Sequence, residues 1–578
     1  MSKPPRARRP PAAPKPAPAV RRERWPAVAA AAITLVALLW AYQPAIGGPF
    51  LFDDTYLPFA LPGFEDKPLS DWVRGVRPLL MLTFWLNFRF SGQEPYWYHV
   101  VNVMLHLAGG AFVFFIARRL LEWAGETARR DLLAGFAAGL FLLHPLQTEA
   151  VAYVASRSEN LSVMLIYGAF TVFLGRSRAG VSWLSSLAVV GLFAAAVLSK
   201  EHAVVLPALL LLTDCFWNHG SPLERIRKNW RLYAPLTLAG ALGMAFVWRI
   251  LGAADTAGFA LKGLPWHHYL FTECRAVWVY ARMFVLPYGQ NVDPEFPISH
   301  SPLEHGSALG MAALVVLAAG AFRFRRRYPL ACYGALVFLL LLAPTSSLVP
   351  IQDPLAERRV YLASLGLILV ALEFLRRWQA GKEMQAAALA AVLLAAGGLT
   401  WARNHVWSSP FTLWEDAVAK SPRKFRPRFQ LAFAHYQVGQ CGPAVEHYAK
   451  AAQLEKPDYR LLVDWALAYD CLGRPADALA RLREAAALKR TAHVWALIGM
   501  VYGKQGQASA ALDSLRIAEK LDPAFAMTYV YRGNVYFTTG DFQGAAAEFR
   551  RALKIAPNNE SALDGLRKAT KMATEAAR

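Results

Sequence analysis

Long apolar segments alternate with short basic connections from residue 26 to residue 401 of the chain. Most of them approach the roughly 20 residues that a helix needs to cross the hydrocarbon core of a membrane. After Trp401 no further segment of this kind occurs. The pattern predicts eleven membrane spans, at 26–44, 99–117, 131–144, 160–175, 181–199, 202–217, 232–250, 307–322, 329–344, 360–375 and 384–401.

The distribution of charge predicts which side each connection occupies. Lys and Arg beside membrane spans are retained on the cytoplasmic side, and every second connection here is basic. Eleven spans with the N-terminus inside therefore place the C-terminal region outside. Segment 268–287 is also apolar, but a twelfth span would move the basic run 323–327 outside. Because it carries Glu273, Arg275 and Arg282, we expect an interfacial or re-entrant helix there.

A repeat with a period near 34 residues occupies the C-terminal region. Gly439, Gly473, Gly506 and Gly540 are separated by 34, 33 and 34 residues, a spacing typical of tetratricopeptide repeats (TPRs). Small, aromatic and proline residues recur at companion positions, in the last repeat Gly533, Tyr536, Ala545, Phe549, Ala552 and Pro557. Helix-capping glycines alone do not produce such a pattern. We predict a half-repeat at 411–422 and about four repeats, whose concave groove binds a peptide or protein.

Composition favours a membrane protein and argues against a nucleic-acid-binding protein. The 578 residues are 55% hydrophobic with a mean hydropathy of +0.26, which is too apolar for a wholly soluble chain. The net charge of +21 is spread beside the apolar segments, whereas a nucleic-acid site needs basic residues on one surface. The five cysteines show no metal-type spacing. A disulfide between Cys441 and Cys471 fits if the repeats lie in an oxidising compartment.

The predicted fold is all-α, with three regions. Residues 1–24 hold seven prolines and eight Lys or Arg against one acid, which predicts a disordered cytoplasmic tail. Residues 25–405 form a polytopic transmembrane domain, and residues 406–573 form the TPR solenoid on the outer side. A cleaved signal peptide is the alternative for 27–42, but the long basic region and the missing cleavage site favour an uncleaved anchor.

Polar and ionisable residues gather at the outer ends of the predicted spans. Asp53 and Asp54 follow the first span. Further polar segments are found at 77–87, 98–106, 144–160, 199–202 and 344–361. Ionisable side chains at a lipid boundary are costly and mark functional sites. Desolvation at such a boundary also raises the basicity of a carboxylate.

This ordered set resembles the transmembrane-and-TPR O-mannosyltransferases and their bacterial relatives, which are polytopic glycosyltransferases of the GT-C class. The motifs that carry the resemblance are the Asp pair, RPL…LTFWLN, YH..N..LH, HPLQTEAVAYVASRSE, SKE and AERRVYL, followed by TPRs. The resemblance covers nearly the whole chain after residue 45. It implies a GT-C-type membrane domain, a polyprenyl-phosphate sugar as donor, with mannose the expected sugar, and Ser or Thr hydroxyls of exported proteins as acceptors. It also implies inversion at the sugar, with the TPRs recruiting the acceptor protein.

The resemblance also implies roles for particular residues. One of Asp53 and Asp54 is the general base, and Arg358 with Arg359 beside Tyr361 binds the donor phosphate. Arg358 is the better candidate, because the next family position is usually apolar and this chain departs there with Arg359. Second-shell or sugar contacts are expected from Arg77, His99, Asn102, His144, Glu149, Arg157, Glu159, Lys200, Glu201 and Glu357. No cofactor is predicted. No metal is predicted either, since the carboxylates show no ligand spacing and the resemblance is to a branch that is not expected to need one. A divalent ion stays an alternative, because related lipid-linked oligosaccharide transferases use it.

Structural roles are the alternative for the same residues. The Asp pair is then a helix cap, Arg358 and Arg359 reach the lipid headgroups, and Lys200 and Glu201 form an ion pair. Histidines at span ends often make purely structural hydrogen bonds. This alternative applies to His99, His106 and His144.

Other functions also remain open at this point. One is transfer of sugar to a lipid or an envelope glycan, or of a whole oligosaccharide. Another is a non-enzymatic, membrane-anchored TPR scaffold. The Arg- and Ala-rich composition favours a bacterial inner membrane, with the N-terminus cytoplasmic and the TPRs periplasmic.

Overall fold

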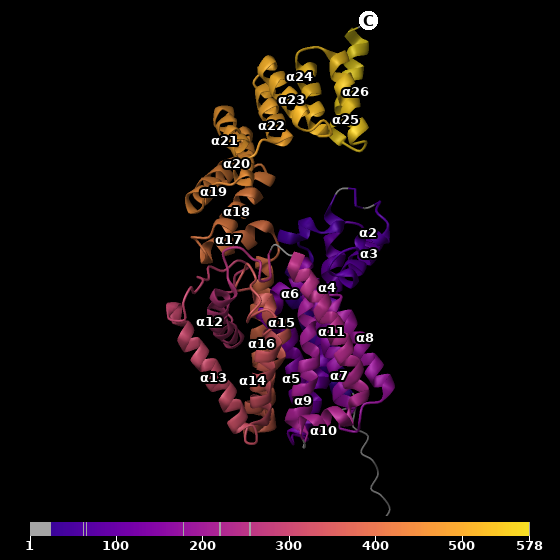
Figure 1. Cartoon of the computed structure of the whole chain (residues 1–578), viewed down its shortest axis with the longest axis vertical. Helices are drawn as coiled ribbons and strands as arrows, with labels where there is room; N and C mark the ends of the chain where they lie inside the picture. Colours follow the sequence, from indigo (N-terminus) through magenta and orange to yellow (C-terminus); the bar gives the residue numbers. More distant parts are fainter. Residues whose placement is uncertain are drawn as a thin grey trace, which may run out of the picture.

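The computed structural model of the chain describes residues 25–576, apart from 62, 65, 177, 219–220 and 254–255. Within these residues the fold is all-α as predicted, with an isolated bridge between Ala257 and Ile351 and no strand. The predicted tail 1–24 lies outside the described residues. Figure 1 shows a bundle of long helices with a helical solenoid at one end.

Helices occur at each of the eleven places where a span was predicted. They are α1 (Trp25–Ile46), α4 (Pro95–Trp123), α5 (Arg130–Leu143), α7 (Arg157–Arg176), α8 (Trp183–Val197), α9 (Leu206–Trp217), α11 (Trp230–Ala253), α13 (Ser307–Phe324), α14 (Pro329–Leu342), α15 (Val360–Arg377) and α16 (Lys382–Val406). By length and apolar composition, six helices of the described residues qualify as spans, or seven if a bent pair at 201–228 counts as one. The number of spans therefore stays a prediction.

Segment 268–287 forms α12 (Trp266–Val285), which is not among the helices that qualify as spans. Its charged residues contact protein groups. Glu273 is buried and lies 3.5 Å from the Arg359 guanidinium. Arg275 donates to the Ser299 hydroxyl at 2.7 Å. These contacts fit a helix packed against the outer loops, although its depth in the membrane stays a prediction.

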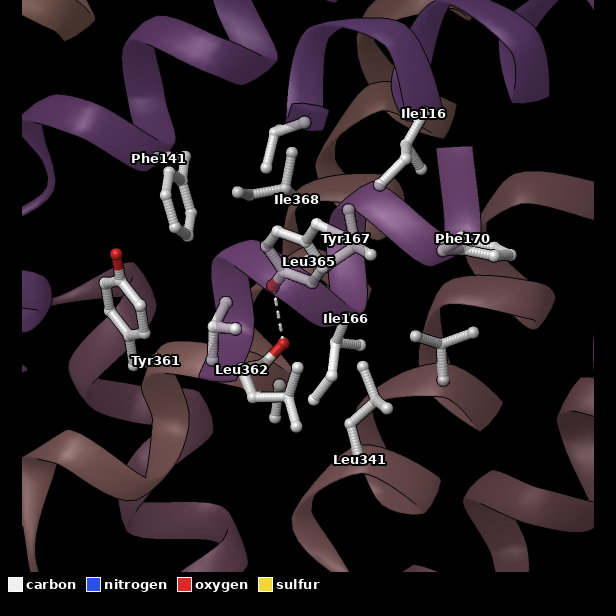
Figure 2. Close-up of a cluster of buried hydrophobic side chains, with 14 of the residues drawn as sticks. Ile116, Phe141, Ile166, Tyr167, Phe170, Leu341, Tyr361, Leu362, Leu365 and Ile368 are labelled. Atoms are coloured by element: carbon white, nitrogen blue, oxygen red, sulfur yellow. Dashed lines mark hydrogen bonds between the residues drawn. The ribbon is translucent and has the colours of Figure 1, made fainter. Parts of the chain in front are cut away.

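Large apolar side chains from α4, α5, α7, α14 and α15 fill the centre of the bundle (Figure 2). Within this cluster the Tyr167 hydroxyl donates to the Leu362 carbonyl at 2.7 Å, which satisfies a polar atom that burial would otherwise leave unpaired. Helices α14 and α15 approach most closely where two glycines face each other. A Cβ atom on Gly334 would lie 2.5 Å from the Gly366 carbonyl oxygen, so no larger residue fits.

Short elements cover the solenoid end of the bundle, where Figure 1 shows α2 and α3, while α10 (Pro222–Lys228) lies at the opposite end. They are η1 (Phe52–Tyr56), η2 (Pro58–Ala60), α2 (Leu69–Trp72), α3 (Pro78–Ser91), η3 (Pro145–Gln147), α6 (Thr148–Ala152), η4 (Val154–Ser156), η5 (Glu201–Val205), η6 (Glu304–Gly306) and η7 (Glu357–Arg359). The polar motifs found in the sequence lie in or beside these elements.

The solenoid consists of one single helix, four helix pairs and a final helix. They are α17 (Pro410–Lys420), α18 (Phe425–Gln437) with α19 (Cys441–Leu454), α20 (Tyr459–Cys471) with α21 (Pro475–Leu488), α22 (Ala492–Lys504) with α23 (Ala508–Leu521), α24 (Ala526–Thr538) with α25 (Phe542–Ile555), and α26 (Glu560–Ala576). The periodic glycines lie at the turns inside the pairs, where Gly506 has a φ of +74° that favours glycine. The domain boundaries at 24/25 and 405/406 stay predictions.

A disulfide joins the first two helix pairs. Cys441 at the start of α19 bonds Cys471 at the end of α20, with 5.9 Å between their Cα atoms. The sequence made this pairing conditional on an oxidising compartment. Disulfides persist in such compartments and are rare in the cytosol. The side of the membrane on which the solenoid lies stays a prediction.

Candidate functional site

Asp53 and Asp54 lie side by side in η1 but in different surroundings. The Asp54 carboxylate is 1% exposed and accepts hydrogen bonds from the backbone N–H of Leu51 at 3.0 Å and of Ala155 at 2.6 Å. Burial raises the pKa of Asp54 to about 7, although these backbone bonds act against the rise. Asp53 is exposed. Asp54 therefore holds η1 against η4, and Asp53 is the carboxylate that a substrate can reach.

Tyr153 binds the backbone of Asp53. Its hydroxyl accepts a hydrogen bond from the Asp53 backbone N–H at 3.0 Å, and its ring stacks on Phe52 and Trp407. The same hydroxyl is within electrostatic reach of Arg358. Tyr153 lies inside a motif that the sequence singled out, but no role was predicted for it.

Arg358 is a partly exposed cation of the site, and Glu149 fixes it. Glu149 Oε2 accepts from the Arg358 backbone N–H at 3.1 Å, and Glu149 Oε1 pairs with the Arg358 guanidinium. The Glu149 side chain is 1% exposed and that of Arg358 is 27% exposed. Burial acts to lower the pKa of Arg358, but the Glu149 carboxylate outweighs it and raises that pKa. Arg358 is thus a permanent positive charge that is partly accessible.

Arg359 and Tyr361, the other predicted phosphate-binding residues, point into the protein. The Arg359 guanidinium donates to the Tyr269 hydroxyl at 3.1 Å and to the Pro354 carbonyl at 2.8 Å. Tyr361 is fully buried, and its hydroxyl contacts His106 Nδ1 at 2.8 Å and Asn160 Oδ1 at 3.0 Å. We therefore correct the predicted clamp and keep Arg358 alone as a candidate for direct phosphate binding.

Arg157 and Asn102 hold the turn that carries Tyr153. The fully buried Arg157 guanidinium donates to Asn102 Oδ1 at 2.8 Å and to Asn87 Oδ1 at 2.9 Å. Asn102 Nδ2 in turn donates to the Val151 carbonyl at 3.2 Å. Both predicted residues thus stabilise this turn. Because both side chains are fully buried, neither can contact a sugar.

Four further predicted residues form two ion pairs beside the site. Lys200 pairs with Glu159 at 2.7 Å, and the Arg77 guanidinium binds both carboxylate oxygens of Glu201, at 2.9 Å and 3.0 Å. Glu159 also lies 3.1 Å from His202 Nδ1. Lys200 and Glu201 therefore bind different partners, and the alternative that they pair with each other is wrong. Both pairs fix η5 against α3 and α7.

Three more predicted residues are buried among protein groups. Glu357 accepts from Gln290 Nε2 at 2.7 Å and from the Asn291 N–H at 2.5 Å, and burial raises its pKa to about 7. His144 Nε2 lies 2.8 Å from the Phe284 carbonyl oxygen. Neither ring nitrogen of the buried His99 has a hydrogen-bond partner among the described residues. Glu357 and His144 thus stabilise the loops through these buried hydrogen bonds.

The solenoid touches this end of the bundle directly. The Arg460 guanidinium donates to the Tyr56 hydroxyl at 2.9 Å, and Arg426 binds Asp293 and Asp353 of two outer loops. No role was predicted for Asp293, Asp353 or Arg426, although Asp353 lies in the polar segment 344–361. No group of three His, Cys, Asp or Glu side chains in the described part of the chain is placed to hold a metal ion.

Comparisons with known proteins agree with the predicted resemblance. The tetratricopeptide-repeat family matches residues 496–560. Protein O-mannosyl-transferase Tmtc1 of Drosophila melanogaster is 39% identical over 139 residues, which is 24% of this chain and 15% of the fly protein. Protein O-mannosyl-transferase TMTC3 of Mus musculus is 23% identical over 558 residues, which is 86% of this chain and 59% of the mouse protein.

The chain thus spans little more than half of the length of the mouse relative, and less of the fly one. Among solved structures, a thermophilic TPR protein of Thermus thermophilus, TTC0263, is 22% identical with a TM-score of 0.25, over 32% of this chain and 95% of its own. The resemblance to the O-mannosyltransferases, predicted from ordered motifs, is confirmed by homologues over much of the chain.

Proposed function

We propose that this chain, a relative of proteins named protein O-mannosyl-transferase, is a membrane glycosyltransferase. It transfers a sugar, mannose by the relatives' names, from a polyprenyl phosphate to Ser or Thr hydroxyls of exported proteins. The observation that supports this most is that Tyr153 interacts with two charges of opposite sign, the exposed Asp53 carboxylate and the partly exposed Arg358 guanidinium. A proton acceptor and a phosphate-binding cation are the two groups that such a transfer needs.

In the proposed reaction the Asp53 carboxylate accepts the proton of the acceptor hydroxyl as its oxygen attacks the anomeric carbon. The new carbon–oxygen bond forms as the bond between that carbon and the phosphate oxygen breaks. The electron pair leaves with the phosphate, whose charge Arg358 stabilises. A single displacement inverts the anomeric configuration. Because the lipid phosphate is already a good leaving group, no second carboxylate acts as acid.

Asp54 has a positioning role in this proposal. Its pKa of about 7 would suit a base, but each of its oxygens accepts a backbone N–H and the side chain is buried. A hydroxyl has no access to it. Asp54 fixes η1, and thereby the direction in which Asp53 points.

Two observations support a proposed location of the reaction. Arg460 of the solenoid donates to Tyr56 of η1, and Arg426 of the solenoid binds Asp353 in the loop before Arg358. Figure 1 shows the solenoid at one end of the bundle, and its disulfide favours an oxidising compartment. We therefore propose that the N-terminus is cytoplasmic and that the site faces the periplasm of a bacterial inner membrane. The concave face of the solenoid then binds the acceptor protein.

Separate substitution of Asp53 and Asp54 tests the assignment. With a polyprenyl-phosphate mannose and an acceptor peptide, we expect D53N to lower the turnover number by about 10²–10⁴-fold, with little change in the KM of the donor. The matched control is D66N, which removes an exposed acid from the same loop. Full transfer by D53N would overturn the assignment of the base. Mass spectrometry of exported proteins from cells with and without the chain identifies the sugar and the acceptors, and no difference would favour a scaffold.

A further inference from the structure

Arg426 joins the solenoid to two outer loops of the membrane domain. It lies in the first turn of α18, the first helix of the first helix pair. Its guanidinium donates to Asp293 at 2.7 Å and 3.0 Å, and to Asp353 at 2.5 Å and 3.2 Å. A planar guanidinium that binds two carboxylates bidentately fixes both of them in one plane. The loops around 293 and 353 are therefore held at a defined distance.

The same guanidinium also reaches the loop of the proposed base. Its central carbon lies 5.8 Å from the centre of the Phe52 ring, which also contacts Trp414 of α17 and Tyr153. Phe52 has a φ of +52°, an unfavourable conformation for a bulky residue. Such a conformation persists only where the surroundings enforce it. Two solenoid side chains, Arg426 and Trp414, thus pack against the residue that precedes Asp53.

The loop that carries the proposed phosphate-binding residue is the second one that Arg426 fixes. While the Asp353 carboxylate binds Arg426, its backbone carbonyl accepts from Arg359, the neighbour of Arg358. Arg426 therefore contacts both halves of the proposed site, through Phe52 on one side and Asp353 on the other.

We infer that Arg426 is a positioning residue through which the first repeat sets the distance between Asp53 and Arg358. The solenoid is then a part of the catalytic unit rather than an independent adaptor. The catalytic half of this inference rests on the proposed function, whereas its geometric half concerns only the order of two loops. The two halves are therefore tested by different measurements.

Hydrogen–deuterium exchange of the purified full chain tests the geometric half. We expect R426Q to speed exchange in 51–57 and 353–359 by about tenfold or more, since the charge-assisted bonds to Asp353 are lost. Asp293 keeps Lys424 as a partner in that variant. R426K keeps the positive charge but lacks the planar guanidinium, so it should raise the exchange rate less than R426Q does. The matched control is R423Q, because Arg423 pairs with Glu295 at the surface with an 81% exposed side chain.

Transfer kinetics test the catalytic half. We expect the turnover number to fall about tenfold in R426Q and in D353N, and the double variant to be no slower than the slower single variant, because both remove one contact. R426K should recover part of the rate. Additive losses, or rate losses that follow a lowered Tm, would mean a merely structural role.

The outcomes separate the inference from the proposed function. Unchanged exchange in both R426Q and R426K overturns the positioning role, even if D53N abolishes transfer. If exchange is faster in R426Q but D53N transfers sugar at the full rate, Arg426 does position the loops and Asp53 is not the base. If R426Q does not fold, R426K and D353N decide the exchange result alone.

Discussion

Glu149 binds Arg358 through both the backbone N–H and the guanidinium of that residue, so one buried carboxylate fixes the place and the direction of a partly exposed cation. Separate bonds to backbone and side chain leave the arginine little rotational freedom. A cation that is ordered before its ligand arrives loses less entropy on binding. The proposed phosphate binding by Arg358 would therefore depend on Glu149.

We expect E149Q to raise the KM of the donor about tenfold, with a smaller effect on the turnover number at saturation. The amide keeps one acceptor oxygen but has no charge, so Arg358 loses the stronger of its two contacts. Steady-state kinetics with varied polyprenyl-phosphate sugar measure the change. E122Q is the control. Glu122 lies at the C-terminal end of α4, where it also pairs with an arginine, Arg119, but in a more exposed position. An unchanged KM in E149Q would contradict the role of Glu149.

Asp54 predicts a pH dependence of stability. Its pKa rises from 3.8 to about 7 on burial, so the folded protein binds more protons than the unfolded chain between these values. The contribution of protonated Asp54 to the free energy of unfolding is therefore fully present below about pH 4. It is lost as the pH rises through 7, which lowers the free energy of unfolding by up to about 4 kcal/mol. We expect the Tm to fall less over this range in D54N than in the natural protein.

Thermal unfolding in detergent at several pH values provides this measurement. Glu357, whose pKa also rises to about 7 on burial, keeps its own contribution in D54N. The dependence should therefore shrink without vanishing. D66N serves again as the control, and an equally steep dependence in D54N would contradict the assignment to Asp54.

The disulfide predicts both a stability loss and a pattern of thiol labelling. Its cysteines are 30 residues apart, and closing a loop of that length contributes about 3–4 kcal/mol in the chain-entropy account. We expect the solenoid of C441S/C471S to be proteolysed at lower temperature than that of C215S, whose cysteine is free. In intact cells, Cys441 and Cys471 should react with a maleimide only after reduction. Labelling without a reductant would argue against an outer, oxidised solenoid.

The contact of α14 with α15 predicts that G366A is destabilised by at least about 1–3 kcal/mol, the usual cost of overpacking. The new methyl group would lie 2.5 Å from the Gly334 carbonyl oxygen, and a backbone atom cannot move aside as a side chain can. In α13, a Cβ atom on Gly320 meets nothing within 4 Å. G320A is therefore the matched control, and thermal unfolding of both variants should separate them.

The positions of the helices could be predicted because two simple physical constraints determine them. A membrane requires long apolar helices, and a solenoid requires small residues at a fixed period, so both leave a pattern in the sequence. The polar motifs at the outer ends were found for the same reason. Acidic side chains at the ends of long apolar segments are costly, so they stand out.

The choice between neighbouring residues could not be predicted. In the short helix η7 successive side chains point about 120° apart, so Arg358 and Arg359 necessarily face different surroundings. Which of them is exposed depends on Glu149 and Tyr269, which lie far away in the sequence. Arg426 was missed because an arginine in a solenoid helix is usually solvated, and its two acidic partners come from loops without regular spacing.

Because Arg426 of the first helix pair and Arg460 of the second fix these repeats against the loops, the separation of Asp53 from each later repeat is set by stacked helices instead of by a flexible tether. An acceptor chain held by the distal repeats would present its hydroxyl groups at a constant number of residues from the bound portion. Selection of the modified serine or threonine would then follow this register more than the identity of its immediate neighbours.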